Sequence, residues 1–249
     1  MTESLDNHYT TARLAEMYDL DSGWSEDREF YLKLAGTTPK SILDLGCGTG
    51  LLCDAYAASG HMVTGVDPAE AMLDVARKKP HAKDIEWILS TAQDFKSSHL
   101  FDLIIMTGHA FQVLLTDRDV IAVFKMMKEH LHPDGLIVFE SRNPLYDWKK
   151  EWNYEITLDT TNGIVTESRK LENFENNLMT FTLNYEFPSD ILTSTSVLKF
   201  WTKAEIEQCL ASANLAIEKI SGTWEDAPFE PSSSMEMIFF VRLDMQVRV

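Results

Sequence analysis

The sequence predicts an α/β fold, a doubly wound and mostly parallel sheet of seven strands with an antiparallel β cap inserted after the fifth strand. Three observations support this. Apolar strands alternate with amphipathic helices from Ser41 to Pro144, apolar residues then recur at every second position from Tyr154 to Trp201, and helix–strand alternation resumes at Thr202. Strand–helix alternation is typical of parallel sheets with right-handed crossovers, and a period of two is typical of antiparallel strands.

The N-terminal part of the predicted core begins with a helix that Ser25 caps and Gly36 ends, with acidic residues in its first turn. Each later helix has apolar residues three or four positions apart, and Pro68 is suited to the start of one of them. The turn at 133–135 leads into the fifth strand. The predicted elements are strand 41–45, helix 51–59, strand 62–66, helix 69–79, strands 85–89 and 101–106, helix 119–131 and strand 136–140.

The predicted cap has three or four antiparallel strands. Asn162 and Gly163 form a two-residue hairpin signal, and apolar residues alternate with polar ones from 179 to 187. Thr202 and Glu205 then make a capping box for the next helix. The last two strands, at 215–221 and 235–243, are expected to pair as an antiparallel hairpin at one edge of the sheet.

Length and charge limit the class of function. At 249 residues the chain is predicted to be one domain, 1–249, with an N-terminal lid at 1–39, a core at 40–144 and 200–249, and a cap at 145–199. The net charge of −17 argues against a nucleic-acid substrate and favours a small molecule. The polar N-terminus is unlike a signal peptide, and three cysteines without metal-binding spacing suit a reducing cytosol. We therefore expect a cytoplasmic monomer or homodimer with no membrane segment and no metal.

The most informative segment of the chain is 41–50, an apolar strand that runs into a loop with glycine at every second position. Glycines let a backbone approach a ligand where side chains would clash. The next apolar strand ends on Asp67, whose carboxylate can accept hydrogen bonds from both hydroxyls of a ribose. These residues predict a nucleoside-binding half-site. An alternative is that Asp67 only caps the helix after Pro68.

The glycine spacing distinguishes between cofactors. A dinucleotide site needs G-x-G-x-x-G, but the position of its third glycine is occupied by Leu51, and the chain has G-x-G-x-G instead. With Asp44 two positions ahead, the segment resembles the first motif of the class I S-adenosylmethionine-dependent methyltransferases, D-x-G-x-G-x-G. This resemblance implies a Rossmann-like methyltransferase fold and transfer of a methyl group from S-adenosylmethionine to nitrogen or oxygen of a small molecule, leaving S-adenosylhomocysteine. Some amino-sugar N-methyltransferases look similar in the order of their elements.

The resemblance also implies roles for residues after the third and fourth strands. The segment 91–95 would hold the adenine, with Asp94 on its amino group and Phe95 against its ring, and 107–111 would line the space around the departing methyl group. His109 is the candidate general base, although a lone histidine is often structural. The expected cofactor-binding residues are Asp44, Gly46, Cys47, Gly48, Gly50, Asp67, Pro68, Met72, Gln93, Asp94, Phe95 and Thr107.

Two further questions stay open at the level of sequence. Arg142 and the aromatic residues Tyr146, Trp148 and Trp152 either wall an acceptor pocket or pack the cap on the core. The alternatives to a methyltransferase are a nicotinamide-dependent oxidoreductase, NAD or NADP, on a related fold and a non-catalytic S-adenosylmethionine-binding protein. Leu51 counts against the oxidoreductase, and turnover with an acceptor would exclude the binding protein.

Overall fold

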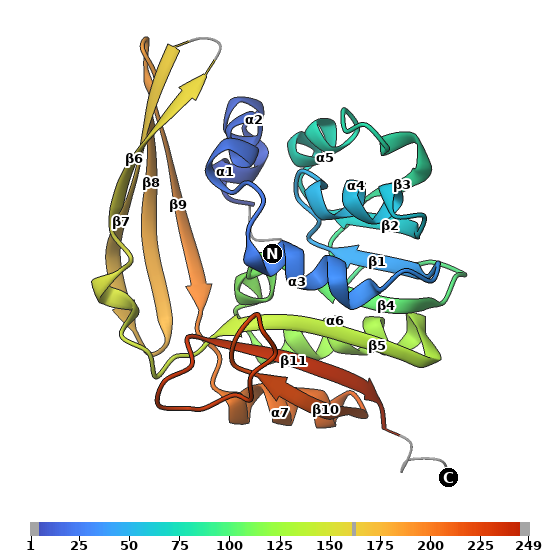
Figure 1. Ribbon diagram of the computed structural model, residues 1–249. Coiled ribbons are helices and arrows are strands. Elements are labelled where there is room, and N and C mark those ends of the chain that lie inside the picture. Colours follow the sequence, from blue (N-terminus) through green and yellow to red (C-terminus); the bar gives the residue numbers. More distant parts are fainter. Residues whose placement is uncertain (1–4, 161–162, 245–249) are drawn as a thin grey trace.

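The computed structural model describes residues 5–160 and 163–244 and contains two sheets. The core sheet has seven strands in the order β10-β11-β5-β4-β1-β2-β3, of which β11 runs antiparallel to both neighbours (Figure 1). The predicted sheet and its terminal hairpin are therefore confirmed. The strands are β1 Ser41–Leu45, β2 Met62–Asp67, β3 Ile85–Leu89, β4 Phe101–Met106, β5 Leu131–Arg142, β10 Leu215–Ser221 and β11 Glu236–Leu243.

Helices cover both faces of this sheet. On one face α3 and α4 pack against β1 and β4, with Tyr31, Leu52 and Tyr56 fully or nearly fully buried. On the other face α6 and α7 form a second apolar cluster with the same strands. The helices of the core are α3 Glu26–Ala35, α4 Leu51–Ala58, α5 Glu70–Ala76, α6 Asp117–His130 and α7 Lys203–Ser212, and the short 3₁₀ turns are η1 Ala82–Asp84, η2 Ala110–Val113 and η3 Trp148–Lys150.

The cap is a separate four-stranded antiparallel sheet inserted between β5 and α7. Its strands are β6 Tyr154–Thr160, β7 Gly163–Glu175, β8 Leu178–Glu186 and β9 Ile191–Lys199. Along β8 the buried side chains alternate with more exposed ones as the period of two predicts. Gly163 pairs with Thr160, while Asn162 of the predicted hairpin signal lies outside the described residues.

The aromatic residues that follow β5 fill the core of the cap. Trp148 and Trp152 are 7% and 2% exposed and pack with Phe181 and Phe200. Trp148 Nε1 also donates to the Asn143 carbonyl at 2.8 Å. Of the two roles open at the sequence level, packing is the one observed for these tryptophans.

Two short helices, α1 Asn7–Thr10 and α2 Ala12–Asp21, lie between the cap and the core and form what we call the lid (Figure 1). On the cap side Leu14 is buried among cap residues, and the backbone N–H of His8 donates to Ser194 Oγ at 2.9 Å. On the core side Asp19 accepts hydrogen bonds from Thr49 in the glycine loop and from Lys79 after α5. The lid therefore links the two sheets.

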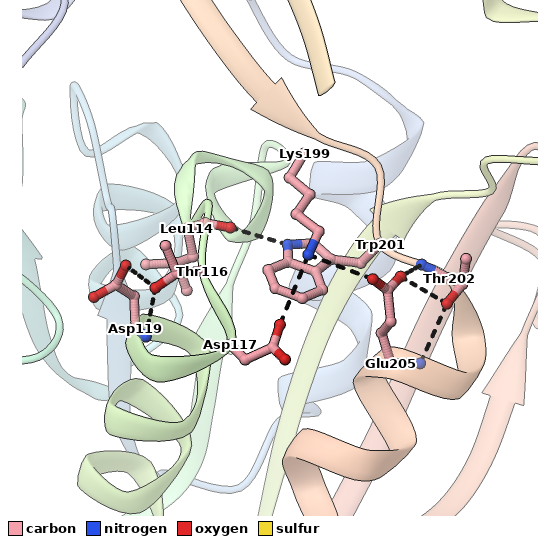
Figure 2. A network of polar contacts seen from close by, with 8 residues as sticks. All are labelled: Leu114, Thr116, Asp117, Asp119, Lys199, Trp201, Thr202 and Glu205. Carbon is pink, nitrogen blue, oxygen red and sulfur yellow. Dashed lines mark hydrogen bonds and ion pairs between the residues drawn. The ribbon is translucent and has the colours of Figure 1, made fainter. Parts of the chain in front are cut away.

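The cap returns to the core through a network around Lys199 (Figure 2). The Lys199 ammonium lies 3.3 Å from the centroid of the Trp201 ring, 3.4 Å from Glu205 Oε1 and 3.7 Å from Asp117 Oδ1. The Lys199 carbonyl accepts from Gln112 Nε2 at 3.1 Å. The end of β9 is thus tied to η2 and to the first turns of α6 and α7.

Several predicted boundaries differ from the structure, and the helix expected at 69–79 spans only Glu70–Ala76. The helix expected at 119–131 begins at Asp117, because Thr116 rather than a later residue is its N-cap and accepts from the Asp119 N–H. The strand expected at 136–140 extends from Leu131 to Arg142. Its pairing with β4 shifts between Phe101 and Leu103, so residues 133–135 are accommodated as an irregularity within the strand rather than a turn before it.

Candidate cofactor and acceptor site

The glycine loop leaves the carboxyl end of β1 in a conformation that only glycine adopts easily. Gly46, Gly48 and Gly50 all have positive φ, at 72°, 55° and 73°. A Cβ at Gly50 would lie 2.5 Å from the Trp87 ring, whereas a Cβ at Gly48 would meet no protein atom within 4 Å. The loop therefore packs tightly against β3 at one end and has open space beside its middle, as a cradle for a ligand requires.

A cavity of about 40 Å³ lies beside this loop. Five of the predicted cofactor-binding residues line it, namely Asp44, Gly46, Cys47, Gly48 and Thr107. The rest of its wall comes from Tyr18 of the lid, Arg28 of α3, and Thr49, Leu51, Leu52 and Gly108. The structure therefore brings β1, β4, α3 and the lid together at the carboxyl edge of the sheet, where open α/β folds bind their ligands.

Asp44 is the buried acid of the cavity wall and is only 1% exposed. Its Oδ2 accepts from the Cys53 thiol at 3.3 Å, and its Oδ1 has no hydrogen-bond partner among the described residues. Burial raises the pKa of Asp44 to about 7. A buried acceptor without a partner beside a cavity is suited to a hydrogen-bond donor of a bound ligand.

Asp67 is held at the end of β2 by two backbone N–H groups. Its Oδ2 accepts from Gly48 at 2.9 Å and its Oδ1 accepts from Ala69 at 2.8 Å, so one carboxylate joins the glycine loop to the start of α5. Burial raises its pKa, and these two hydrogen bonds act in the opposite direction. Each carboxylate oxygen can accept a further hydrogen bond. Asp67 can therefore hold the start of α5 and still accept from a ribose, so its two predicted roles are compatible.

The remaining predicted cofactor residues lie outside the wall of this cavity. Phe95 is 2% exposed and packs in the core against Phe101 and His130, and Met72 is 1% exposed between α5 and the lid. Asp94 is exposed and accepts from Thr91 Oγ1 at 2.8 Å. Their adenine and cofactor roles stay predictions, as do those of Gly50, Pro68 and Gln93.

His109 follows β4 in the left-handed conformation, with φ of 61°. Its backbone N–H donates to Glu140 Oε1 at 2.7 Å, and its Nε2 lies 3.0 Å from Glu236 Oε1. Non-glycine residues in this conformation are uncommon and gather at functional sites. When Nε2–H donates to Glu236, Nδ1 keeps its lone pair and can accept a proton.

Sequence reasoning missed three charged residues of this region. Glu140 and Glu236 orient His109 from β5 and β11, and the Arg28 side chain lines the cavity while donating to the Gly23 carbonyl at 2.6 Å and to Ser25 Oγ at 2.9 Å. Glu236 and Arg28 belong to segments without a motif. Only the register of β11 on β5 would have placed Glu236 in this region, because that register sets Glu236 opposite Arg142.

Two absences hold for residues 5–160 and 163–244. No group of three or more His, Cys, Asp or Glu side chains there is arranged to hold a metal ion. Within the same ranges no helix combines the length and the apolar character needed to cross a bilayer.

Comparison with known proteins gives matches in sequence and in structure. Residues 42–135 match the family described as "Methyltransferase domain". A cypemycin N-terminal methyltransferase of Streptomyces sp. is 30% identical over 105 residues, 42% of this chain and 43% of that one. A ubiquinone biosynthesis O-methyltransferase of Actinobacillus pleuropneumoniae is 34% identical over 121 residues, 45% of this chain and 49% of that one. The chain thus spans less than half the length of these curated relatives.

The solved structures match over nearly the whole chain. An S-adenosylmethionine-dependent methyltransferase from Clostridium acetobutylicum superposes with a TM-score of 0.77 at 18% identity, covering 93% of this chain and 98% of that one. A sugar N-methyltransferase from Streptoalloteichus sp. superposes with a TM-score of 0.72 at 15% identity, covering 98% and 96%. These likenesses establish the fold, cap included. Residues 42–135, less than half of the chain, thus match a methyltransferase domain, and the solved structures show that the chain has the fold of S-adenosylmethionine-dependent methyltransferases.

Proposed function

We propose that the protein binds S-adenosylmethionine at the glycine loop, with its methionine part in the cavity beside the loop, and transfers its methyl group to a nitrogen or oxygen atom of a small molecule. The observation that carries this proposal is the pairing of an open glycine cradle with the partnerless Asp44 Oδ1 in the wall of the same cavity. A nicotinamide dinucleotide fits this loop less well, because Leu51 begins α4 where a third glycine would allow close packing under a pyrophosphate.

The chain offers complementary groups for each part of the cofactor. Asp44 would accept from the amino group, and Arg28 would pair with the carboxylate, because both side chains reach the same cavity. Asp67 would accept from the ribose hydroxyls. Tyr18 would cover the methionine part from the lid, and Asp94 would remain the candidate partner of the adenine amino group.

The cofactor brings a methyl group on a positively charged sulfur, already activated for in-line displacement. The protein then needs mainly to hold two reactants in line, which can supply ~7–11 kcal/mol of the barrier. For a hydroxyl acceptor, His109 would take the proton at Nδ1 while Glu236 holds Nε2. An amine acceptor that arrives unprotonated would not require this step.

The acceptor would approach from the side of the cap. Small-molecule acceptors agree with the acidic charge of the chain, and one of the similar solved structures is a sugar N-methyltransferase. The cysteines of the described residues are free thiols, which favours a reducing, cytosolic location.

Isothermal titration with S-adenosylhomocysteine, with NAD and NADP in parallel, tests the proposal. The demethylated product is stable and binds without an acceptor. Micromolar affinity for it alone is the expected result, and binding of a nicotinamide cofactor instead would overturn the proposal. Release of S-adenosylhomocysteine in a screen of amines, amino sugars and phenols would separate an enzyme from a non-catalytic binding protein.

A further inference from the structure

Arg142 is a buried cation at the junction of the core and the cap. It is the last residue of β5 and lies opposite Glu236 of β11, between the fully buried Ser141 and the nearly fully buried Asn143, yet it keeps some exposure to solvent. Its guanidinium lies 5.5 Å from the Trp148 ring centroid and 5.2 Å from that of Trp152. Arg142 therefore stands at the same sheet edge as His109, where the cap begins.

The guanidinium is held from one side. Its Nη1 donates to Gln112 Oε1 at 3.0 Å. Gln112 is itself fully buried and fixed, because its Nε2 donates to the Lys199 carbonyl at the other junction of the cap. An arginine fork has five N–H donors, so most of its hydrogen-bonding capacity is not used by the described part of the chain.

The carboxylates of Glu236 and Glu140 act on Arg142 through space but form no ion pair with it, and Glu236 Oε2 has no hydrogen-bond partner among the described residues. Glu236 Oε1 contacts His109, and Glu140 accepts from the His109 N–H and from the Tyr31 hydroxyl. Among the described residues no carboxylate lies at ion-pair distance from Arg142. Burial lowers the pKa of Arg142 to about 10, the direction expected for a charge that has lost water without gaining a direct counter-ion.

A second guanidinium lies beside the same indole ring. Arg169 of β7 is 4.3 Å from the Trp152 ring centroid and 4.4 Å from that of Tyr154, and its Nε donates to the Trp152 carbonyl at 2.8 Å. The positive charge of Arg169 acts on Arg142 and helps to lower its pKa. Arg169 has the carboxylates of Asp21 and Glu167 acting on it, whereas Arg142 keeps free N–H donors beside the same ring.

We propose that Arg142 binds an anionic group of the acceptor, a carboxylate or a phosphate, at the junction of core and cap, and that Gln112 positions its guanidinium for this contact. Both anions present two oxygens to the planar fork, the geometry in which arginine binds most strongly. This inference rests on the proposed function, and it refines it from a small molecule in general to one with an acidic group.

Binding of small anions to the full-length protein tests the proposal. Sodium benzoate and phenyl phosphate are titrated into the protein with and without S-adenosylhomocysteine, and benzamide serves as the neutral probe. We expect at least one anion to bind saturably, benzamide not to bind, and Arg142→Met to weaken anion binding tenfold or more. Preference for benzoate or for phenyl phosphate would distinguish a carboxylate from a phosphate acceptor.

Matched variants distinguish loss of the planar Arg142 guanidinium from loss of positive charge in general and from loss of folding. Arg118→Met removes one exposed arginine from α6 and should bind the anion as the wild type does. Arg142→Lys keeps the charge, the fold and part of the stem but loses the fork, so an intermediate loss of several-fold is expected. Gln112→Leu should also weaken anion binding while leaving S-adenosylhomocysteine affinity unchanged.

Three results would overturn the proposal. They are absence of anion binding to the wild type, equal binding of benzoate and benzamide, and wild-type anion affinity in both Arg142 variants. Failure of S-adenosylhomocysteine to bind would instead count against the proposed function, because the anion titration is also made without it. The two failures are therefore distinguishable.

Discussion

At the scale of single residues, Asp44 connects stability with binding. Its buried carboxyl has a pKa of about 7 in the folded protein against 3.8 in an unfolded chain. Because the folded state holds the proton more tightly, the free energy of unfolding should fall as pH rises from about 4 to about 7 and level off above. Thermal unfolding of the cofactor-free protein between pH 5 and 8 would measure this fall.

The variant Asp44→Asn removes the charge and keeps the size. We expect its melting temperature at pH 8 to exceed that of the wild type, with a smaller difference at pH 5, because an amide carries no desolvated charge. Its affinity for S-adenosylhomocysteine at pH 8 should fall, since the acceptor for the amino group is lost. If Asp44→Asn melted below the wild type at pH 8, the ionised Asp44 carboxylate would not be destabilising the fold.

Asp67 should contribute to stability through the two backbone N–H bonds that its carboxylate accepts. Asp67→Ala leaves the Gly48 and Ala69 donors without this partner, which should cost about 2–4 kcal/mol of stability. Affinity for S-adenosylhomocysteine should fall by a few kcal/mol as the ribose acceptor disappears. Calorimetry measures both quantities, and unchanged affinity in a folded variant would remove Asp67 from the cofactor site.

His109 combines a strained backbone with the candidate base. In His109→Ala the left-handed conformation remains, whereas His109→Gly should relieve about 1 kcal/mol of strain. Both variants should lower turnover of a hydroxyl acceptor and leave S-adenosylhomocysteine affinity unchanged. Glu236→Gln should lower turnover less, because the amide still contacts Nε2. Full turnover in both His109 variants would show that the histidine is structural.

At the scale of elements, the start of α7 offers a separate test of stability. Thr202 Oγ1 accepts from the Glu205 N–H, and the Glu205 side chain accepts from the Thr202 N–H, in a complete capping box. Thr202→Ala should cost about 1 kcal/mol and lower the melting temperature by ~2–4 °C. Glu205 also contacts Lys199 at the end of the cap (Figure 2), so a larger loss would mean that the cap junction loosens as well.

Most elements could be predicted because their signals are local. The strands at 41–45, 85–89, 101–106 and 215–221 have the predicted bounds, since continuous or alternating apolar runs end at glycine, proline or polar residues. The length of β5 could not be predicted. Residues 131–135 contain a proline and a glycine; Leu131 pairs with Phe101 of β4, and Arg242 Nη1 donates to the carbonyls of Asp134 and Gly135, contacts that no local pattern indicates.

In the candidate site, too, some residues could be predicted from a local motif and others could not. The loop residues Asp44, Gly46 and Gly48 are close in sequence and form a motif, so their place beside a cavity could be predicted. Glu236 meets His109, and Gln112 meets Arg142, across sequence separations of 127 and 30. Such contacts depend on the register of β11 and on the path of the chain through the cap, which no local pattern encodes.

At the scale of the whole molecule, the lid is the part that contacts both the cap and the core. It is tied to the cap by His8 and Leu14 and to the glycine loop by Asp19, and Tyr18 lines the cavity. The lid consists of two short helices, α1 and α2, in the N-terminal region, and terminal elements are among the regions that open with low free energy. Access to the cavity should therefore depend on movement of residues 7–21.

Bound S-adenosylhomocysteine would contact Tyr18 and stabilise the closed lid, because a ligand stabilises the state that it binds best. Hydrogen exchange at residues 7–21 should slow on addition of S-adenosylhomocysteine, while exchange in β8 of the cap, which has no contact with the cavity, should change little. Tyr18→Ala should reduce the protection of the lid and weaken binding. Equal exchange in the lid with and without saturating ligand would mean that the cavity is reached without opening of the lid.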